Sequence, residues 1–441
     1  MSNGKKEELS NYDLSAGDKI RIKTSSEEVR EGFFIPSAKQ DGDIVLKLES
    51  GYNIGLKEEN IEKLEVIERK KQGKEDVGKN KDFKYSKDAK NVLILHTGGT
   101  IASRVSYEEG GVKPGFSVED LKEIYPEIFE TANISSEIIS QMLSEDMEPS
   151  HWKKISEKVF ENLEDFDGII ISHGTDTMQY TASALSFMIK NISKPVVLVG
   201  SQRSSDRPSS DSFLNLKAAV KFIEEDIPGV FVCMHGSSDD EIVFVHRGTR
   251  VRKMHTSRRD AFKSIRSEPF AEIDIEKDKL VLNGEIQKTE DETELLNDLD
   301  EEVGFLKVVP GMKKKDLEKL EGCNGLIIEG TGLGHLPVNS FDEHTKHHEK
   351  ILGKLEEICE DTVVCMTSQC INGRVNLDVY DSGVKIKDAG VVSGRSMLPG
   401  TAYVKLMWAL GNSDTLEESK DLLLKNVAGE FIEREDYDVF R

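Results

Sequence analysis

Short apolar runs alternate with longer amphipathic stretches along most of the chain after residue 90. Runs of this kind predict buried strands at residues 92–95, 168–171, 196–199, 230–234 and 242–245. Helix-like stretches lie between them, at residues 152–163, 178–190 and 215–225. A second set follows, with strands at residues 325–329 and 362–367 and helices near 344–359 and 403–410. Strands alternating with helices favour doubly wound, mostly parallel α/β sheets.

The N-terminal part of the chain has a different pattern. Residues 18–23 alternate polar and apolar, and further short strand-like runs are separated by turn residues at 32–36, 44–48, 52–56 and 64–66. This spacing predicts a small SH3-like β-barrel, a fold that binds RNA or protein in some cases and is only a spacer in others. Residues 68–90 are charged and nearly free of apolar side chains, which is typical of a flexible linker.

The predicted organisation is therefore two doubly wound α/β domains preceded by a small β-barrel. The boundaries that follow from the pattern are a barrel at 1–70, a charged linker at 71–90, and α/β domains at 91–290 and 291–441. A chain of 441 residues is long enough for several separate cores.

Composition narrows the classes of function. The formal net charge of -23 argues against nonspecific nucleic-acid binding by the whole surface, because phosphates repel it. No apolar run approaches the roughly 20 residues of a membrane span, and the polar first residues do not resemble a signal peptide, so we expect a cytoplasmic protein. The five cysteines include no C-x-x-C pair and are expected to be reduced and mostly buried.

Glycine and hydroxyl residues follow four of the predicted strands. These turns lie at residues 96–100, 172–177, 200–203 and 330–334. In open α/β sheets, ligands bind beyond the carboxyl ends of the strands, so the four turns predict a site at one sheet edge. One or two such turns would be expected by chance.

The first turn contains two threonines and two glycines. Gly98 and Gly99 allow backbone conformations that a Cβ would forbid, and a threonine hydroxyl beside them is a candidate nucleophile. A tight loop without chemistry explains the same residues. In the second turn, residues 173–177 precede a predicted helix, whose N-terminus suits a carboxylate or a developing oxyanion. The alternative is that Asp176 or Thr177 only caps that helix.

A threonine nucleophile needs a base. The candidates are a carboxylate such as Asp176 and a lysine whose charged form is disfavoured by neighbouring cations. Residues 247–266 carry eight Lys and Arg side chains, and sequence spacing alone does not choose among them. A solvated basic face or a phosphate or RNA patch would explain the same stretch.

Two of these turns resemble the signature motifs of the L-asparaginase and glutaminase-asparaginase family. They are residues 97–102 (TGGTIA) and 173–178 (HGTDTM), about 75 residues apart, and the resemblance extends from residue 91 to the C-terminus. It implies a nucleophilic Thr100, assisted by Thr175, Asp176 and Lys253, without a metal. It also implies a substrate site formed by Gly99, Ser144, Glu145, Gly174 and the flexible-loop Tyr107. Glu145 departs from the glutamine that is common in the family.

An asparaginase-like body with an N-terminal extension is similar to the D subunits of archaeal glutamyl-tRNA(Gln) amidotransferases. The resemblance implies a glutaminase without a cofactor of its own that passes ammonia to an E subunit. The E subunit would bind tRNA(Gln) and use ATP and Mg²⁺. The resemblance further implies a homodimer core within a heterotetramer, without a membrane partner. The alternatives are a free-standing asparaginase or glutaminase with an added domain, and a non-catalytic binding protein.

Overall fold

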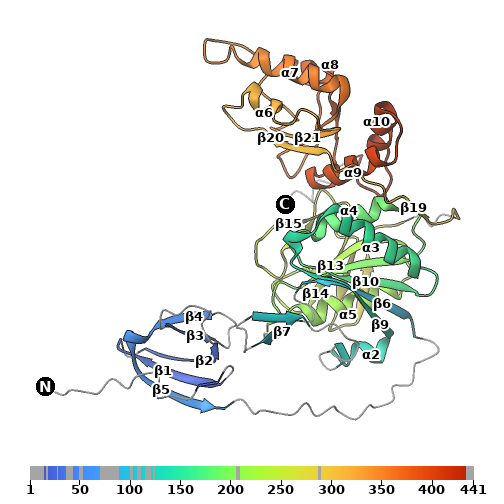
Figure 1. The fold of residues 1–441 in the computed structure, drawn as a ribbon. Helices are drawn as coiled ribbons and strands as arrows, with labels where there is room; N and C mark the ends of the chain where they lie inside the picture. The colour runs from blue at the N-terminus through green and yellow to red at the C-terminus, as the bar shows by residue number, and fades with distance from the viewer. Residues whose placement is uncertain are drawn as a thin grey trace.

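The computed structural model shows a small β domain followed by two α/β domains (Figure 1). It describes residues 14–15, 18–26, 28–35, 43–48, 53–69, 89–99, 103–106, 111–114, 121–122, 125–204, 209–286 and 290–433. The predicted arrangement, two α/β domains after a small β domain, is confirmed.

The N-terminal domain is one antiparallel sheet with the strand order β4-β3-β2-β1-β5. Its strands are β1 (Lys19–Thr24), β2 (Val29–Ile35), β3 (Asp43–Lys47), β4 (Asn53–Lys57) and β5 (Ile61–Glu68). Alternation of apolar and polar residues places one face of the strands in a small core, formed by Ile20, Ile22, Ile44, Leu46 and Leu64. The five strands coincide with the runs that predicted a barrel.

The first α/β domain is built on an eight-stranded sheet with the order β18-β17-β14-β13-β12-β10-β6-β9. The strands are β6 (Asn91–Gly98), β9 (Asn133–Met142), β10 (Gly168–Ser172), β12 (Pro195–Val199), β13 (Gly229–His235), β14 (Ile242–Arg247), β17 (Ala271–Asp274) and β18 (Lys279–Leu282). The pairs from β9 to β13 are parallel, and those from β13 to β18 are antiparallel. The carboxyl ends of β6, β10 and β12 therefore meet at one edge.

Helices cover both faces of this sheet (Figure 1). Leu93 and Leu95 of β6 pack in the core that contains α3 (Pro149–Asn162) and α4 (Met178–Met188). The intervening Val92 and Ile94 pack in the core on the other face, with α5 (Ser212–Ile223) and α2 (Ile128–Thr131). Burial on both faces explains why the strands read as continuous apolar runs.

The second α/β domain has a smaller parallel sheet with the order β20-β21-β22-β23. Its elements are β20 (Val303–Lys307), α6 (Lys314–Glu318), β21 (Gly325–Gly330), α7 (His348–Asp361), β22 (Val363–Ser368), α8 (Asp381–Asp388), β23 (Val392–Ser393), α9 (Pro399–Gly411) and α10 (Leu416–Leu424). Apolar residues of α9 share one core with α4, so this helix joins the two domains. The sequence pattern did not predict β9, β20, α8 or α10.

Three short strand pairs complete the described structure. They are β7 (Ser103–Ser106) with β8 (Gly111–Pro114), β11 (Ile189–Lys190) with β19 (Glu294–Leu295), and β15 (Val251–Lys253) with β16 (Phe262–Ser264). The β15–β16 hairpin carries Lys253, one of the predicted site residues, at the end of β15.

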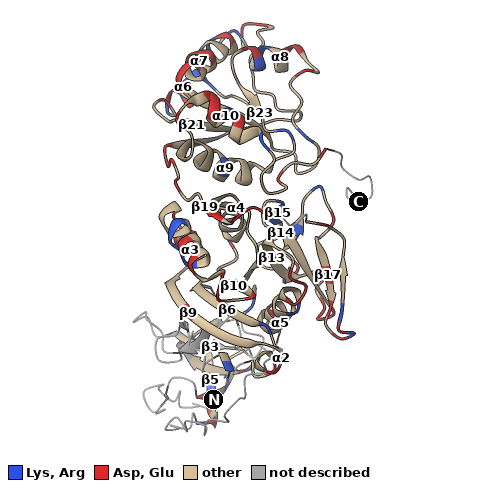
Figure 2. Cartoon of the chain, turned by 90° about the vertical axis from the view of Figure 1, so that its right-hand side faces the viewer, with Lys and Arg blue, Asp and Glu red and all other residues tan. Residues whose placement is uncertain are grey.

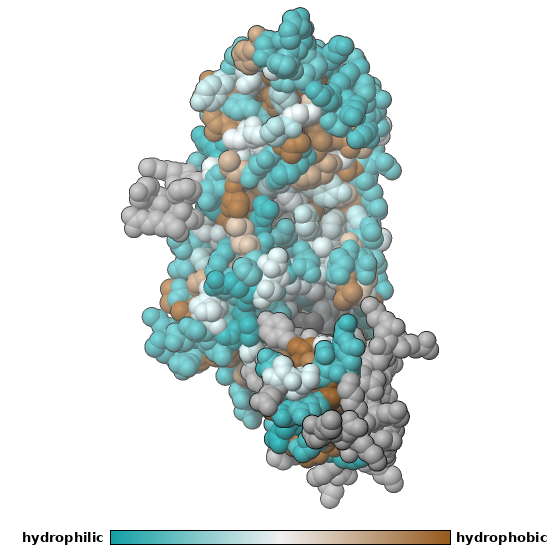
Figure 3. Space-filling view, turned by 90° about the vertical axis from the view of Figure 1, so that its left-hand side faces the viewer, coloured by the Kyte–Doolittle hydropathy of each residue, from teal (hydrophilic) through white to brown (hydrophobic). Residues whose placement is uncertain are grey.

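The surface is mainly hydrophilic on the face shown in Figure 3, where hydrophobic residues form small separate areas. Both acidic and basic residues occur along the ribbons of α3 and α7 (Figure 2), and ion pairs such as Lys158–Glu161 at 3.0 Å join some of them. Within the described residues, no helix combines the length and apolar character that crossing a membrane requires. All five cysteines are free thiols. Cys233 and Cys365 are buried, Cys323 and Cys359 are half-buried and Cys370 is exposed, so the prediction of mostly buried cysteines holds for two of the five.

Candidate active site

Three of the four predicted turns meet at the carboxyl edge of the first sheet. They follow the neighbouring strands β6, β10 and β12. Gly99 has a φ of +83°, and a Cβ there would lie 2.9 Å from the backbone nitrogen of Gly174. A Cβ on Gly200 would lie 2.8 Å from Cγ2 of Thr175. Glycine at these positions therefore lets the first and third turns approach the second closely.

The fourth turn does not belong to this edge. It follows β21, which lies in the separate four-stranded sheet of the second domain. A Cβ on its Gly334 would meet Val375 and Met366 of the same domain. The prediction that all four turns share one edge is therefore wrong for residues 330–334, because β20 starts a new sheet instead of extending the first.

Thr175, Asp176 and Lys253 form a compact hydrogen-bonded group at the edge of the first sheet. Nζ of Lys253 lies 2.7 Å from Oγ1 of Thr175 and 2.8 Å from Oδ1 of Asp176. The Lys253 side chain is 11% exposed, whereas that of Asp176 is 64% exposed. One amino group thus joins a nearly buried hydroxyl to a carboxylate that faces solvent, which is the arrangement needed to move a proton to or from the threonine.

The backbone of Lys253 is fixed by a residue that the sequence did not single out. The Lys253 N–H donates to Oε1 of Gln179 at 2.9 Å, and Gln179 lies in the first turn of α4. This bond ties the β15–β16 hairpin to the helix that begins just after Asp176. Glutamine next to a signature motif gave no sequence signal, because its partner lies 74 residues away.

Ser144 packs directly against the second turn. Its Oγ accepts from the backbone N–H of Asp176 at 3.2 Å, and its carbonyl accepts from the hydroxyl of Thr177 at 2.5 Å. A Cβ on Gly174 would lie 2.7 Å from the Cβ of Ser144. Glu145 follows in the same short turn with its side chain exposed. The structure therefore brings the predicted substrate residues Gly99, Ser144 and Gly174 together beside Thr175.

Thr177 is the N-cap residue of α4, but its hydroxyl does not cap the helix. It donates instead to the Ser144 carbonyl, 33 residues earlier in the chain. The simple capping interpretation of this turn is therefore wrong for Thr177, whose side chain links the turn to Ser144.

The hydroxyl of Thr97 forms a hydrogen bond within the sheet. It is buried and donates to the carbonyl of Ser172 at 2.9 Å. The preceding His96 is also buried, with Nδ1 2.8 Å from the Ser172 hydroxyl, and burial lowers the pKa of its ring to about 4. Both side chains therefore hold β6 against β10. Thr100 and Tyr107, predicted as nucleophile and loop tyrosine, lie outside the described residues.

Four of the cations of residues 247–266 have partners other than the Lys253 group. Buried Arg250 donates to the carbonyls of Ile265 and Glu430 at 2.7 and 3.1 Å, and Arg266 donates to three carbonyls of the second domain. Arg258 and Arg259 pair with Asp260 and Asp240. Arg250 and Arg266 therefore hold the two domains together, and the phosphate-patch interpretation does not apply to these two side chains.

The third turn is held by a buried carboxylate. Asp211 accepts from the backbone N–H groups of Gln202 at 3.0 Å and Arg203 at 2.9 Å, and from the side-chain amide of Asn215 at 3.1 Å. The sequence analysis missed Asp211. Because a buried carboxylate is costly unless several donors satisfy it, these bonds fix the loop that approaches Thr175 through Gly200.

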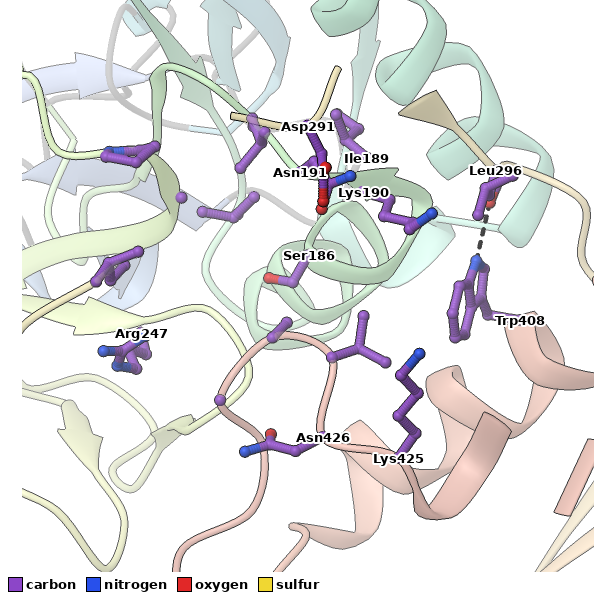
Figure 4. A pocket seen from close by; sticks show the side chains of 18 of the residues that line it. Ser186, Ile189, Lys190, Asn191, Arg247, Asp291, Leu296, Trp408, Lys425 and Asn426 are labelled. Atoms are coloured by element: carbon purple, nitrogen blue, oxygen red, sulfur yellow. Dashed lines mark hydrogen bonds between the residues drawn. The ribbon is translucent and has the colours of Figure 1, made fainter. Parts of the chain in front are cut away.

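A large cavity lies away from this group. It has a volume of about 930 Å³ and lies between the two α/β domains, where Ser186 and Lys190 face Trp408 and Lys425 (Figure 4). Ser186 is near the C-terminal end of α4, whereas Asp176 precedes its N-terminal end. The 11-residue helix separates the two places by roughly 15 Å. We therefore place the chemistry at the glycine turns, where the hydrogen-bonded group lies.

Among the residues that the structure describes, no group of three or more His, Cys, Asp or Glu is placed to hold a metal ion. The polar groups that do converge are hydroxyls, one amine, one exposed carboxylate and backbone N–H groups. Such a set is suited to acyl transfer through a hydroxyl nucleophile.

Comparison with known proteins agrees with this geometry. The asparaginase N-terminal family matches residues 91–288, and the glutaminase/asparaginase C-terminal domain matches residues 302–423. The L-asparaginase of Thermococcus kodakarensis is 32% identical with a TM-score of 0.70, and covers 78% of this chain and 100% of its own. L-asparaginase I of Vibrio cholerae is 29% identical with a TM-score of 0.68, covering 78% and 99%. Fold and site thus define an asparaginase-type protein.

The N-terminal domain places the chain more narrowly. Residues 14–67 match the GatD N-terminal domain. The D subunit of the glutamyl-tRNA(Gln) amidotransferase of Pyrococcus abyssi is 45% identical over 449 residues, covering 98% of both chains. That of Methanopyrus kandleri is 44% identical, covering 96% of this chain and 93% of its own. The chain belongs to the family of glutamyl-tRNA(Gln) amidotransferase D subunits.

Proposed function

We propose that this chain is the glutaminase subunit of a tRNA-dependent amidotransferase, with a threonine nucleophile. The observation that carries the proposal is the position of the Lys253 amino group, within hydrogen-bond distance of both Thr175 and Asp176. The full-length similarity to subunits named for glutamyl-tRNA(Gln) amidation supports glutamine as the substrate.

In the proposed reaction, the hydroxyl oxygen of Thr100 attacks the side-chain amide carbon of glutamine. The hydroxyl proton passes to Lys253 through the hydroxyl of Thr175, while Asp176 orients the amino group and balances its charge. The carbonyl oxygen becomes an oxyanion that backbone N–H groups of the glycine turns stabilise. The C–N bond then breaks, the nitrogen takes the proton, and ammonia leaves a γ-glutamyl ester on Thr100. Water cleaves the ester and releases glutamate.

The choice of Thr100 over Thr97 is supported by the surroundings of the first turn. The Thr97 hydroxyl is buried and donates to Ser172, so it is not available to a substrate. Thr100 directly follows Gly99, where an added Cβ would lie 2.9 Å from the backbone nitrogen of Gly174, next to Thr175 in the chain.

The substrate's α-carboxylate and α-amino groups are assigned to Ser144 and Glu145, with Gly99, Gly174 and Tyr107 completing the site. Ser144 is supported by its direct contacts with the Thr175–Asp176 turn. The exposed Glu145 carboxylate suits an ammonium group.

The ammonia is proposed to serve an E-type partner subunit that amidates glutamyl-tRNA(Gln). In this arrangement the partner binds most of the tRNA and uses ATP and Mg²⁺, and this chain needs no cofactor. The net charge of -23 fits a chain that is not the main RNA-binding subunit. A homodimer core within a heterotetramer, in the cytoplasm, is part of the same proposal.

Replacing the proposed nucleophile tests the assignment. The Thr100→Ala variant should release no ammonia from glutamine above background, because no acyl-enzyme can form. The matched control is Thr97→Val, which should be less stable but should retain kcat within about tenfold. Near-normal glutaminase activity of the Thr100→Ala variant would show that another residue is the nucleophile.

The second candidate is a free-standing asparaginase, favoured by the two L-asparaginase structures that match most of the chain. Ammonia release from asparagine and glutamine should be compared for the chain alone and with its copurifying partner and glutamylated tRNA. Fast asparagine hydrolysis by the chain alone, unaffected by the partner, would favour the second candidate. Glutamine hydrolysis that rises only with the partner and tRNA would favour the amidotransferase.

A further inference from the structure

A buried chain of hydrogen bonds lies directly behind the second turn. The indole N–H of Trp152 in α3 lies 3.0 Å from Oγ1 of Thr181 in α4. The same hydroxyl lies 2.8 Å from Nε2 of His173, and Nδ1 of His173 lies 2.6 Å from the carbonyl oxygen of Gly174. All three side chains are buried, and none of them takes part in the reaction proposed above.

The geometry fixes the direction of every bond in this chain. A carbonyl oxygen only accepts, so Nδ1 of His173 carries a proton and donates to Gly174. Burial lowers the pKa of His173 to about 4, so the ring is neutral near pH 7 and Nε2 has no proton. Nε2 therefore accepts from the Thr181 hydroxyl, whose oxygen in turn accepts from Trp152. Only this arrangement gives every polar atom in these three hydrogen bonds a partner.

This arrangement sets the orientation of one peptide unit. In a trans peptide the C=O and the following N–H point in opposite directions in one plane, so a Gly174 carbonyl held toward His173 directs the N–H of Thr175 away from it. No described residue accepts a hydrogen bond from the Thr175 N–H, whereas the next N–H, of Asp176, is taken by Ser144. Within the described part of the chain, the Thr175 N–H therefore has no acceptor, and the proposed reaction requires a donor for the oxyanion.

We infer that His173 is a positioning residue: through the Gly174 carbonyl it aims the Thr175 N–H at the oxyanion that forms on the substrate amide. The inference rests on the proposed function and adds to it the side chains that orient one of the backbone donors. Thr181 and Trp152 act through His173, because they hold the ring in the tautomer that can donate to Gly174. A donor that is oriented before the reaction stabilises the transition state more than the bound substrate, so its loss should lower kcat more than it raises KM.

The test uses paired substitutions in the full-length chain, assayed for ammonia release from glutamine under conditions where the wild type is active. His173→Leu removes both ring nitrogens, whereas His173→Asn keeps an N–H near the position of Nδ1. Thr181→Val removes the hydroxyl with little change in shape, and Thr181→Ser keeps it. Thr175→Ala is assayed in parallel as a test of the proposed reaction itself.

His173→Leu should lower kcat by about 10- to 100-fold, somewhat less than removal of an oxyanion-hole donor, with KM changed less than about threefold. His173→Asn should recover most of that loss. Thr181→Val should lower kcat by a smaller factor, and Thr181→Ser should be close to the wild type. Circular dichroism and urea denaturation should show that each assayed variant is folded.

The outcomes distinguish the positioning role of His173 from the proposed reaction. If folded His173→Leu and Thr181→Val variants keep the wild-type kcat while Thr175→Ala is inactive, the positioning role is overturned and the proposed reaction stands. A rise in KM with unchanged kcat also overturns it, since the interaction would then act on the bound substrate. If Thr175→Ala itself is active, the proposed reaction fails. Should His173→Leu not fold, the Thr181→Val and Thr181→Ser pair decides.

Discussion

Removal of the Lys253 amino group separates the chemistry of this site from its stability. Lys253→Met keeps a long unbranched side chain and leaves the hydroxyl of Thr175 and the carboxylate of Asp176 without their common partner. The Asp176 side chain is 64% exposed, so water replaces the lost ion pair, and such exposed pairs contribute about 0–1 kcal/mol. Loss of the hydrogen bond to the nearly buried Thr175 adds about 1 kcal/mol.

The expected cost to catalysis is much larger. Positioned proton transfer contributes about 10²- to 10⁴-fold to rate, equivalent to about 3–5 kcal/mol of activation free energy. Lys253→Met should therefore lower kcat for glutamine by at least about 100-fold, while the free energy of unfolding falls by only about 1–2 kcal/mol. Ammonia release measures the first quantity, and urea denaturation measures the second.

Lys263→Met is the matched control. Lys263 lies on the paired strand β16, opposite Arg252, and its amino group contacts the Gly236 carbonyl at 3.3 Å and Asp260 at 3.5 Å. The same change of residue there should leave kcat nearly unchanged. The assignment of Lys253 as the base is refuted if Lys253→Met retains kcat within tenfold of the wild type, or if Lys263→Met loses as much activity.

Three further predictions concern the frame around the site. Lys405→Met should lower the free energy of unfolding by about 3–5 kcal/mol in urea titrations, because it leaves the fully buried Glu430 carboxylate without its cation; a loss below 1 kcal/mol would contradict this. Gly174→Ala should abolish most activity and lower stability, because the new Cβ would lie 2.7 Å from the Cβ of Ser144. If this contact is the cause, adding Ser144→Gly to the same variant should restore part of the lost stability. The free energy of unfolding should also fall as the pH is lowered from about 6.5 toward 4. Three buried histidines stay neutral in the folded protein but take up protons when it unfolds, so each should cost about 1–2 kcal/mol at pH 5. A urea midpoint that is independent of pH over this range would contradict that prediction for His96, His173 and His246.

The architecture was largely predictable, because burial on both faces of a sheet produces continuous apolar runs. Runs such as residues 168–171 and 196–199 correspond to the central strands β10 and β12. The elements that the pattern missed are those whose burial is mixed. β9 at the sheet edge carries polar and apolar residues without clear alternation, and β20 is short and half exposed. Periodicity is weak in such elements, so only tertiary contacts identify them.

The candidate site was predictable in part for a different reason. Turn residues with special backbone requirements stand out in a sequence, so Gly99, Gly174 and the threonines next to them could be selected directly. Gln179 and Asp211 could not, because a helical glutamine and an aspartate at the start of a helix are ordinary residues until their partners are known. His173 stood inside a recognised motif, and its role still required the bond from Nδ1 to the Gly174 carbonyl.

The choice of Lys253 among the cations of its segment required both the sequence and the structure. Eight cations in residues 247–266 were equivalent as a list, and like-charge repulsion was expected to select the base. The structure separates them by direction: Arg250 and Arg266 point into the fold and bind carbonyls, whereas Lys253 ends the β15 strand and reaches Thr175. Lys253, the proposed base, is therefore distinguished by a short hairpin that a hydrogen bond from its backbone N–H to Gln179 holds against α4. A change that loosens this hairpin should impair the proposed proton transfer, although Thr175, Asp176 and Lys253 are all retained.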